Sequence, residues 1–267
     1  MSGQGESGAR STSRRSPVSE TRSRCAARRE AQLDNCHISR EHPRVPHDSS
    51  PLDFIAPNSR AVPRPKDPSS PYFGVDPEEW REVTAELISE HPLDPRILRD
   101  AVLQSWDDIF ESSIGLGRIG AGIDPDPQIM GYLLHELIPV RISAESREWR
   151  KDSASDEKDL VYVPNPSYSI EIKSSTNAMQ IFGNRSYGVE RTEDGRGRQL
   201  KKAKSGYYCA INFERWVDAP GRRPEIRRIR FGWIDSTDWV AQRAETGQAS
   251  TLPRAVYANQ LAVIYSR

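Results

Sequence analysis

Two acidic residues and a lysine lie on neighbouring apolar segments near the middle of this 267-residue chain. Asp159 stands directly before segment 160–163, and Glu171 and Lys173 lie two positions apart within segment 168–173. Both segments have the β-branched and aromatic composition of strands, and the Pro-Asn-Pro-Ser sequence between them has turn chemistry. The sequence therefore predicts a β-hairpin.

The hydrophobic pattern also predicts the register of this hairpin. Pairing Asp159 with Glu171 sets Leu160 opposite Ile170, so one side of the ribbon is wholly apolar. The other side then carries both acids and Lys173. A slip of one residue would send charged side chains into the core, so the pattern selects the register that gathers them.

Three groups in this arrangement suit metal-dependent cleavage of a phosphodiester. Two carboxylates on paired strands, about 5 Å apart between Cα atoms, can share a small hard cation such as Mg2+, which prefers oxygen ligands. Lys173 could orient or deprotonate a water molecule and offset charge on the phosphorus. The alternative is an exposed strand whose charges only keep a hairpin soluble, since an acid-x-Lys triplet is common by chance.

The segments around this hairpin resemble a known family. Asp159 and Glu171-Ile172-Lys173 are similar to the PD-(D/E)xK nuclease signature, with Lys158 where the motif has proline. The longer run 170–187 resembles the ScaI-type group of type II restriction endonucleases. With 131–139 upstream and 231–235 downstream, the resemblance covers about residues 75–265.

This resemblance implies a fold, a cofactor and partners. The fold would be restriction-endonuclease-like, a mixed β-sheet flanked by helices, and Mg2+ would be held by Asp159, Glu171 and the carbonyl of Ile172. Lys173 would position the attacking water. The substrate would be double-stranded DNA carrying a six-base palindrome, cut by a homodimer to leave 5'-phosphate and 3'-hydroxyl ends. A DNA methyltransferase would belong to the same system without direct contact.

Glu136 lies among the apolar residues of a predicted helix before the hairpin. In PD-(D/E)xK folds a glutamate on this helix often points at the active site, so the resemblance implies a catalytic role for Glu136. The alternative is a solvated carboxylate or a salt bridge to Arg141. Its neighbour His135 is interpreted as a packing or surface residue.

DNA contacts are expected after the hairpin. Residues 185–230 hold thirteen Lys or Arg against six acids, an excess of seven positive charges, although most such runs are merely solvated. Lys201 and Lys202 are assigned to the DNA backbone. Gln180, Asn184 and Arg185 are of the types that read adenine and guanine edges, and their place in the family-like run supports that role.

The chain divides by composition into two parts. Residues 1–70 are rich in Ser, Arg and Pro and are predicted to be a disordered segment, followed by a nuclease domain over 71–267. The formal net charge of +0 gives no global sign of a nucleic-acid partner. No segment has the length of a membrane span and Arg14-Arg15 precedes no apolar stretch, so a cytoplasmic protein without membrane contact is expected.

The sequence of residues 71–267 predicts an α/β or α+β fold. Asp-Pro pairs begin three helices, and apolar runs indicate three further strands and a short helix. These helices start at 76, 94 and 126, the strands cover 207–213, 226–234 and 261–265, and the short helix covers 235–242. Strand 207–213 is nearly continuously apolar and is predicted to be central.

Other groups of residues in the sequence are weaker evidence for a function. The glycines at 115, 117 and 120 follow a helix rather than a strand, so they predict a loop and not a dinucleotide site. Cysteine and histidine side chains near the N-terminus fit no standard zinc spacing; they are Cys25, Cys36, His37 and His42. Cys209, inside an apolar strand, is expected to be buried.

Two other functions remain open from the sequence. One is another PD-(D/E)xK nuclease, acting in repair or junction resolution. The second is a sequence-specific DNA-binding protein whose acids are only structural. Metal-dependent cleavage of plasmid separates the second from the enzymes.

Overall fold

The computed structural model describes residues 65, 67–187, 205–242 and 249–267. All of the described residues belong to one compact unit. The cysteines and histidines near the N-terminus, Lys201, Lys202 and nearly all of the predicted disordered segment lie outside the described residues. Ser70, at the end of that segment, is buried and donates to Asp235 Oδ2 over 2.5 Å.

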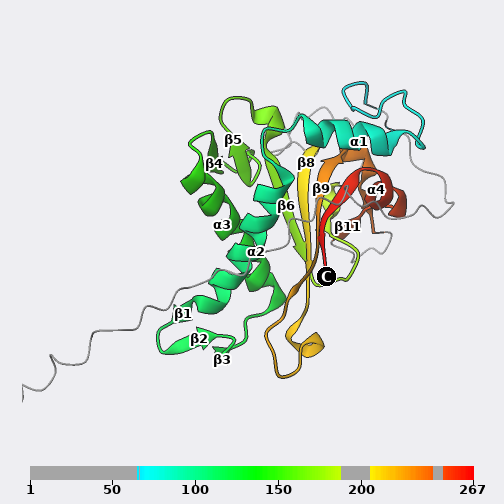
Figure 1. Ribbon diagram of the computed structural model, residues 1–267. Helices are drawn as coiled ribbons and strands as arrows, with labels where there is room; N and C mark the ends of the chain where they lie inside the picture. Colours follow the sequence, from blue (N-terminus) through cyan, green and yellow to red (C-terminus); the bar gives the residue numbers. More distant parts are fainter. Residues whose placement is uncertain (1–64, 66, 188–204, 243–248) are drawn as a thin grey trace, which may run out of the picture. The chain divides into compact units, whose positions relative to one another are not determined.

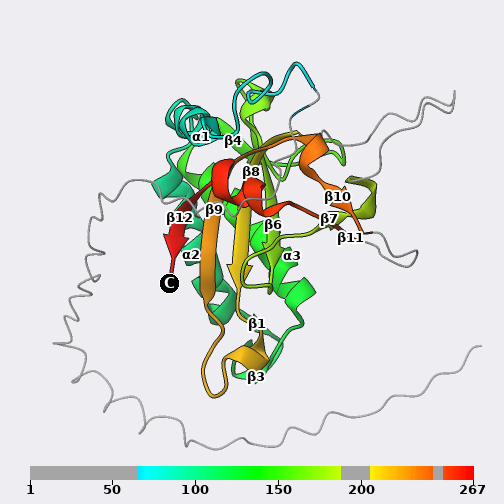
Figure 2. The ribbon, with the colours of Figure 1, turned by 90° about the vertical axis from the view of Figure 1, so that its right-hand side faces the viewer.

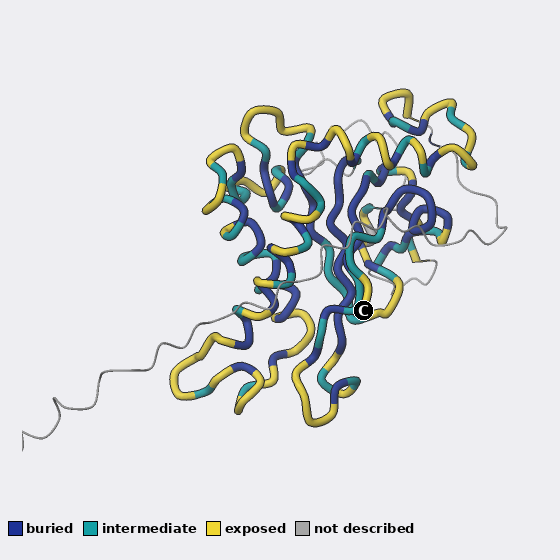
Figure 3. Tube along the Cα trace, viewed as in Figure 1, coloured by how far each residue is buried: buried dark blue, intermediate teal, exposed yellow. Residues whose placement is uncertain are grey.

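A six-stranded mixed sheet forms the centre of the described unit, in the order β12-β9-β8-β6-β5-β4. Only β6 and β8 run parallel, and the other neighbours are antiparallel. Its strands are β4 (Trp149–Lys151), β5 (Leu160–Tyr162), β6 (Ile170–Ser175), β8 (Gly206–Phe213), β9 (Ile226–Ile234) and β12 (Leu261–Ser266). β8 lies between β9 and β6 and every one of its residues is buried, which confirms its predicted central place (Figures 1 and 3).

Helices cover the sheet on both faces (Figures 1 and 2). On one face, α2 (Pro95–Glu111) and α3 (Pro127–Glu145) form the larger core with inward residues of β6, β8 and β9. The opposite face carries a smaller core that includes residues of α4 (Arg254–Asn259). α1 (Trp80–Ser89) contacts β9, β12 and α4.

Two small sheets complete the described unit. One has the order β1-β2-β3 and the other the order β10-β11-β7. Their strands are β1 (Ser113–Ile114), β2 (Gly117–Ile119), β3 (Gly122–Ile123), β7 (Gly183–Asn184), β10 (Val240–Ala241) and β11 (Ala249–Thr251). In the described ranges, every helix is too short or too polar to span a lipid bilayer.

Most predicted elements are confirmed, and the differences have local causes. The helix expected from residue 76 begins at Trp80, because Asp76 first closes a turn by accepting from the Glu78 amide over 3.1 Å. The helix expected over 235–242 is wrong: a single 3-10 turn, Ser236–Asp238, is followed by β10. The glycine-rich stretch 113–123, expected to be a loop, forms the β1-β2-β3 sheet.

The predicted hairpin is present with the predicted register. Leu160 pairs with Ile170, although this is the one paired position between β5 and β6 in the described sheet. The second strand begins at Ile170 rather than at Tyr168, since Pro166–Tyr168 form a 3-10 turn that is capped by Asn165. The ladder between β5 and β6 is therefore short, and β6 is positioned mainly by its pairing with β8.

Candidate active site

Asp159 lies at the start of β5, where the ladder to β6 ends. Its Oδ2 atom accepts a hydrogen bond from the backbone amide of Ile172 over 2.7 Å. A side chain thus replaces the next rung of the ladder and satisfies a backbone donor. Because Ile172 lies between Glu171 and Lys173, this bond fixes the first acid beside the second acid and the lysine.

Glu171 and Lys173 form an ion pair on β6. Glu171 is buried, and the Tyr187 hydroxyl lies 3.5 Å from its Oε1 atom. The Lys173 ammonium is 5.8 Å from the centre of the Tyr187 ring. Burial disfavours the charged ammonium, but Glu171, Tyr187 and Asp159 together outweigh it and hold the pKa of Lys173 above its ordinary value. Lys173 is therefore a cation in this setting.

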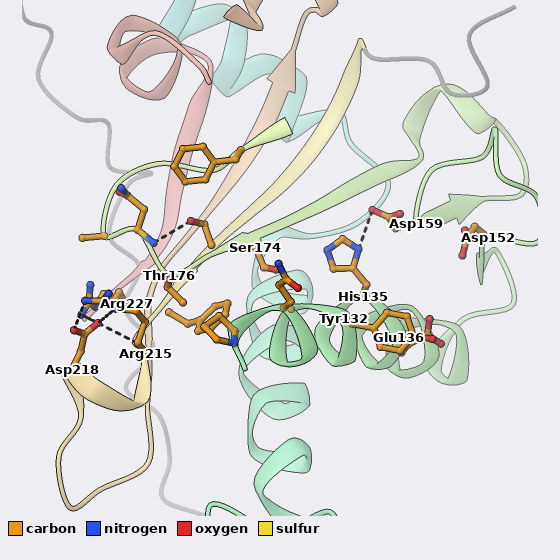
Figure 4. Close-up of a pocket in the computed structure, with 18 of the residues that line it drawn as sticks. Tyr132, His135, Glu136, Asp152, Asp159, Ser174, Thr176, Arg215, Asp218 and Arg227 are labelled. Carbon is orange, nitrogen blue, oxygen red and sulfur yellow. Dashed lines mark hydrogen bonds and ion pairs between the residues drawn. The ribbon is translucent and has the colours of Figure 1, made fainter. Parts of the chain in front are cut away.

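A groove of about 1010 Å³ borders the site on the α3 side (Figure 4). Asp159 and His135 point toward one another at one end, with 3.6 Å between Oδ2 and Nδ1. Arg215, Asp218 and Arg227 line the other end. Glu171 and Lys173 are not among the described residues that line this groove.

The polar face of α3 lines the groove at helical spacing. The α3 residues that line the groove are Pro127, Gln128, Gly131, Tyr132, His135 and Glu136. A Cβ atom at Gly131 would lie 2.6 Å from Ser174 Oγ, so a glycine is needed for α3 to approach β6 this closely. The interpretation of His135 as packing or surface missed its place beside Asp159, although the spacing of these polar residues could have shown it.

Glu136 also lines the groove, but its ion-pair partner differs from the one considered. It pairs with Lys151 of β4, and the expected alternative of a bridge to Arg141 is wrong. Arg141 instead pairs with Asp108 and donates to Gln104. Strand β4 was not predicted, so no sequence pattern pointed to Lys151 as the partner.

The residues expected to read bases fall in two settings. Gln180 is half-buried, and its carbonyl accepts from the Asn212 side chain over 3.0 Å. Asn184 is exposed at the end of β7, where its carbonyl accepts from Ser250 Oγ over 2.9 Å. Arg185 begins the next 3-10 turn, and its side chain lies outside the described part.

The donor chemistry of the site fits a hard cation. Asp159 and Glu171 supply carboxylate oxygens, and Ile172, which follows Glu171, supplies a carbonyl; these are the ligand types that Mg2+ prefers. Across the described ranges, no three Asp, Glu, His or Cys side chains gather into one metal-binding group. The candidate set is therefore two carboxylates and one carbonyl. Cys209 takes no part, because it is buried as expected and burial raises the pKa of its thiol.

A mixed sheet flanked by helices, with an acid at the start of one strand and Glu-Ile-Lys on the next, defines a nuclease of the PD-(D/E)xK class. Comparison with known sequences narrows this class. The family model described as ScaI restriction endonuclease matches residues 70–265. The type II restriction enzyme ScaI of Streptomyces caespitosus is 57% identical over 204 residues, which cover 76% of this chain and 88% of that protein. The chain belongs to the ScaI restriction endonuclease family, and it is an enzyme of the type II restriction class.

Proposed function

We propose that this protein cuts both strands of palindromic duplex DNA in a Mg2+-dependent reaction. The observation that carries the proposal is the hydrogen bond from the Ile172 amide to Asp159, which fixes the first acid beside Glu171 and Lys173. Membership of the ScaI family supports the type of substrate. The proposal assigns Asp159, Glu171 and the Ile172 carbonyl to the metal.

Each residue has a separate task in this reaction. Mg2+, when bound, would supply Lewis-acid stabilisation of the charge that develops on the phosphate. Lys173, held as a cation by its acidic neighbours, positions the attacking water and offsets negative charge. The water oxygen bonds to phosphorus while the bond to the 3' oxygen breaks, which leaves a 5'-phosphate and a 3'-hydroxyl. Glu136, one helical position beyond His135, orients water at the edge of the site.

The assembly follows from the symmetry of the substrate. A palindrome presents the same half-site twice, so two chains related by a two-fold axis place one site at each strand. We assign Gln180, Asn184 and Arg185 to base edges and Lys201 and Lys202 to phosphates. The enzyme would act in the cytoplasm, beside a DNA methyltransferase that protects the same sequence without contacting it.

The test uses supercoiled plasmid, purified protein and a titration of Mg2+, with excess chelator as the control. The expected result is a fixed set of linear fragments whose ends share one palindromic sequence, and no fragments in chelator. Ligation without kinase treatment would verify the 5'-phosphate ends. Intact plasmid at every Mg2+ concentration, together with tight sequence-specific binding, would favour a DNA-binding protein instead.

Fragment sequences and particle mass decide the remaining alternatives. Cleavage at branched or damaged DNA without a shared sequence would favour a repair or junction nuclease. Sedimentation of the protein on a duplex with the mapped site should give two chains per duplex. One chain per duplex with full double-strand cleavage would exclude the symmetric dimer.

A further inference from the structure

Three buried side chains contact or support the segment that follows strand β6. Segment 177–181 follows β6 and ends at the fully buried Ile181. Behind it lie Asn212 of β8, Arg230 of β9 and Tyr257 of α4, with relative exposures of 0%, 0% and 5%. We call these three residues the Asn212 cluster.

Asn212 connects the segment to the sheet through its amide group. Its Nδ2 atom donates to the carbonyls of Asn177 over 2.7 Å and of Gln180 over 3.0 Å. Its Oδ1 atom accepts from Arg230 Nη1 over 2.8 Å. Both amide protons are thus directed at the segment, and the oxygen is directed at the guanidinium. One side chain fixes two backbone positions three residues apart.

Tyr257 holds the end of the same segment. Its hydroxyl accepts from the Ile181 amide over 2.9 Å and also lies 3.3 Å from the Ile181 carbonyl. The Arg230 guanidinium lies 5.2 Å from the centre of the Tyr257 ring. The side chain of Asn177 itself accepts from the amides of Met179 and Gln180, so the turn is closed from within as well.

The burial of a charged group with polar partners costs desolvation free energy, so stability alone does not explain the Asn212 cluster. Within the described residues, the Nε and Nη2 atoms of Arg230 have no hydrogen-bond partner. Burial, with the nearby Arg228, lowers the pKa of Arg230 to about 10. Well-packed apolar side chains often replace buried charges without loss of stability, so the polar groups point to a geometric role.

We propose that Asn212, supported by Arg230 and Tyr257, is a positioning residue for sequence readout. It fixes the backbone of segment 177–181, and through it the placement of Gln180 and Asn184 toward base edges. This inference rests on the proposed function, since it concerns how the enzyme separates its own site from near matches.

The sharpest test is Asn212→Asp. The aspartate keeps the shape and the acceptor for Arg230, but it sets a carboxylate oxygen against the carbonyls of Asn177 and Gln180. Asn259→Asp is the matched control, because Asn259 is also buried and its Oδ1 accepts from an arginine, Arg81, over 3.2 Å. Tyr257→Phe is the milder second variant, which removes only the hydroxyl.

Wild-type fragments first define the recognition site. Single-turnover cleavage is then measured on a duplex with that site and on duplexes with one base pair changed. Asn212→Asp and Tyr257→Phe should lower the ratio of these rates about tenfold or more, the size of one lost base contact. Asn259→Asp should leave the ratio unchanged. Equal slowing on all duplexes by both cluster variants would mean a merely structural role and would overturn the proposal.

Hydrogen exchange gives a readout that does not depend on cleavage. Amides in peptides covering 177–181 should exchange faster in Asn212→Asp and Tyr257→Phe than in wild type and Asn259→Asp. Unchanged exchange in Tyr257→Phe would overturn the proposal even if Asn212→Asp does not fold. If wild type cuts no DNA, the proposed function fails by itself, and exchange rates still decide whether the cluster holds the segment.

Discussion

Strand β6 and the segment that follows it are held in place by different means. β6 pairs along its whole length with β8, from Ile170 opposite Tyr207 to Ser175 opposite Asn212, so its position comes from a backbone ladder. Segment 177–181 has no ladder and is fixed by side chains 32 to 76 residues later in the chain. Glu171 and Lys173 are therefore placed by a backbone ladder, whereas segment 177–181 is placed by a few polar contacts to distant residues.

The largest effect on cleavage is expected from substitutions of Glu171 and Lys173 on β6. Glu171→Ala should remove a metal ligand and Lys173→Ala a cation, so each should slow cleavage about a thousandfold or more. Lys173→Ala should keep its affinity for the mapped site in Ca2+, because the lysine acts mainly in the transition state. Rates are measured on supercoiled plasmid, with Asp100→Ala as an exposed acid control. Cleavage by Glu171→Ala near the wild-type rate would remove this assignment.

A stability prediction concerns Asp238, the last residue of the 3-10 turn Ser236–Asp238. Burial, with the nearby Asp235, raises the pKa of Asp238 to about 7. A raised carboxyl pKa favours the folded state below pH 4, and this contribution is lost as the pH rises through 7. Asp238→Asn should therefore match wild type near pH 4 and exceed it at pH 8, by at most about 4 kcal/mol at roughly 1.4 kcal/mol per pH unit.

Urea unfolding of both proteins from pH 4 to pH 8 measures this difference. Asp100→Asn serves as an exposed control whose effect should not change over this range. A difference between Asp238→Asn and wild type that is the same at every pH would contradict the raised pKa. In that case the Asp235 amide, which donates to Asp238 over 2.8 Å, would be sufficient to stabilise the carboxylate.

The sequence predicts those parts of the fold that depend on the pattern of residue types within a short stretch of chain. The register of Leu160 with Ile170 follows from alternation within about fifteen residues, and α2 and α3 follow from their Asp-Pro starts. Lys151 as the partner of Glu136, and Asn212 as the support of Gln180, are contacts between elements. They depend on the packing of helices and strands, and no spacing along the chain encodes them.

Variants of the residues assigned to DNA contact should have different effects from variants of Glu171 and Lys173 on β6. Asn184→Ala or Arg185→Ala should cost about 1 to 3 kcal/mol of discrimination for each lost bidentate contact. Lys201→Ala or Lys202→Ala should weaken all sequences alike and reduce the salt dependence by about one ion. Binding to cognate and single-mismatch duplexes in Ca2+ separates these outcomes. If Asn184→Ala and Arg185→Ala weaken both duplexes equally, these residues contact the backbone.

The smallest effect concerns Glu136, whose carboxylate pairs with Lys151 at the edge of the groove. An exposed ion pair contributes about 0 to 1 kcal/mol to stability, so Glu136→Gln and Lys151→Met should both change unfolding only slightly. If Glu136 also orients water, Glu136→Gln should slow single-turnover cleavage about tenfold, because a neutral amide is a weaker acceptor than a carboxylate. Lys151→Met, which leaves the carboxylate in place, should keep most of the activity. Equal rates for the two variants would reduce Glu136 to a structural partner of Lys151, and the catalytic groups would then all lie on the β5–β6 hairpin.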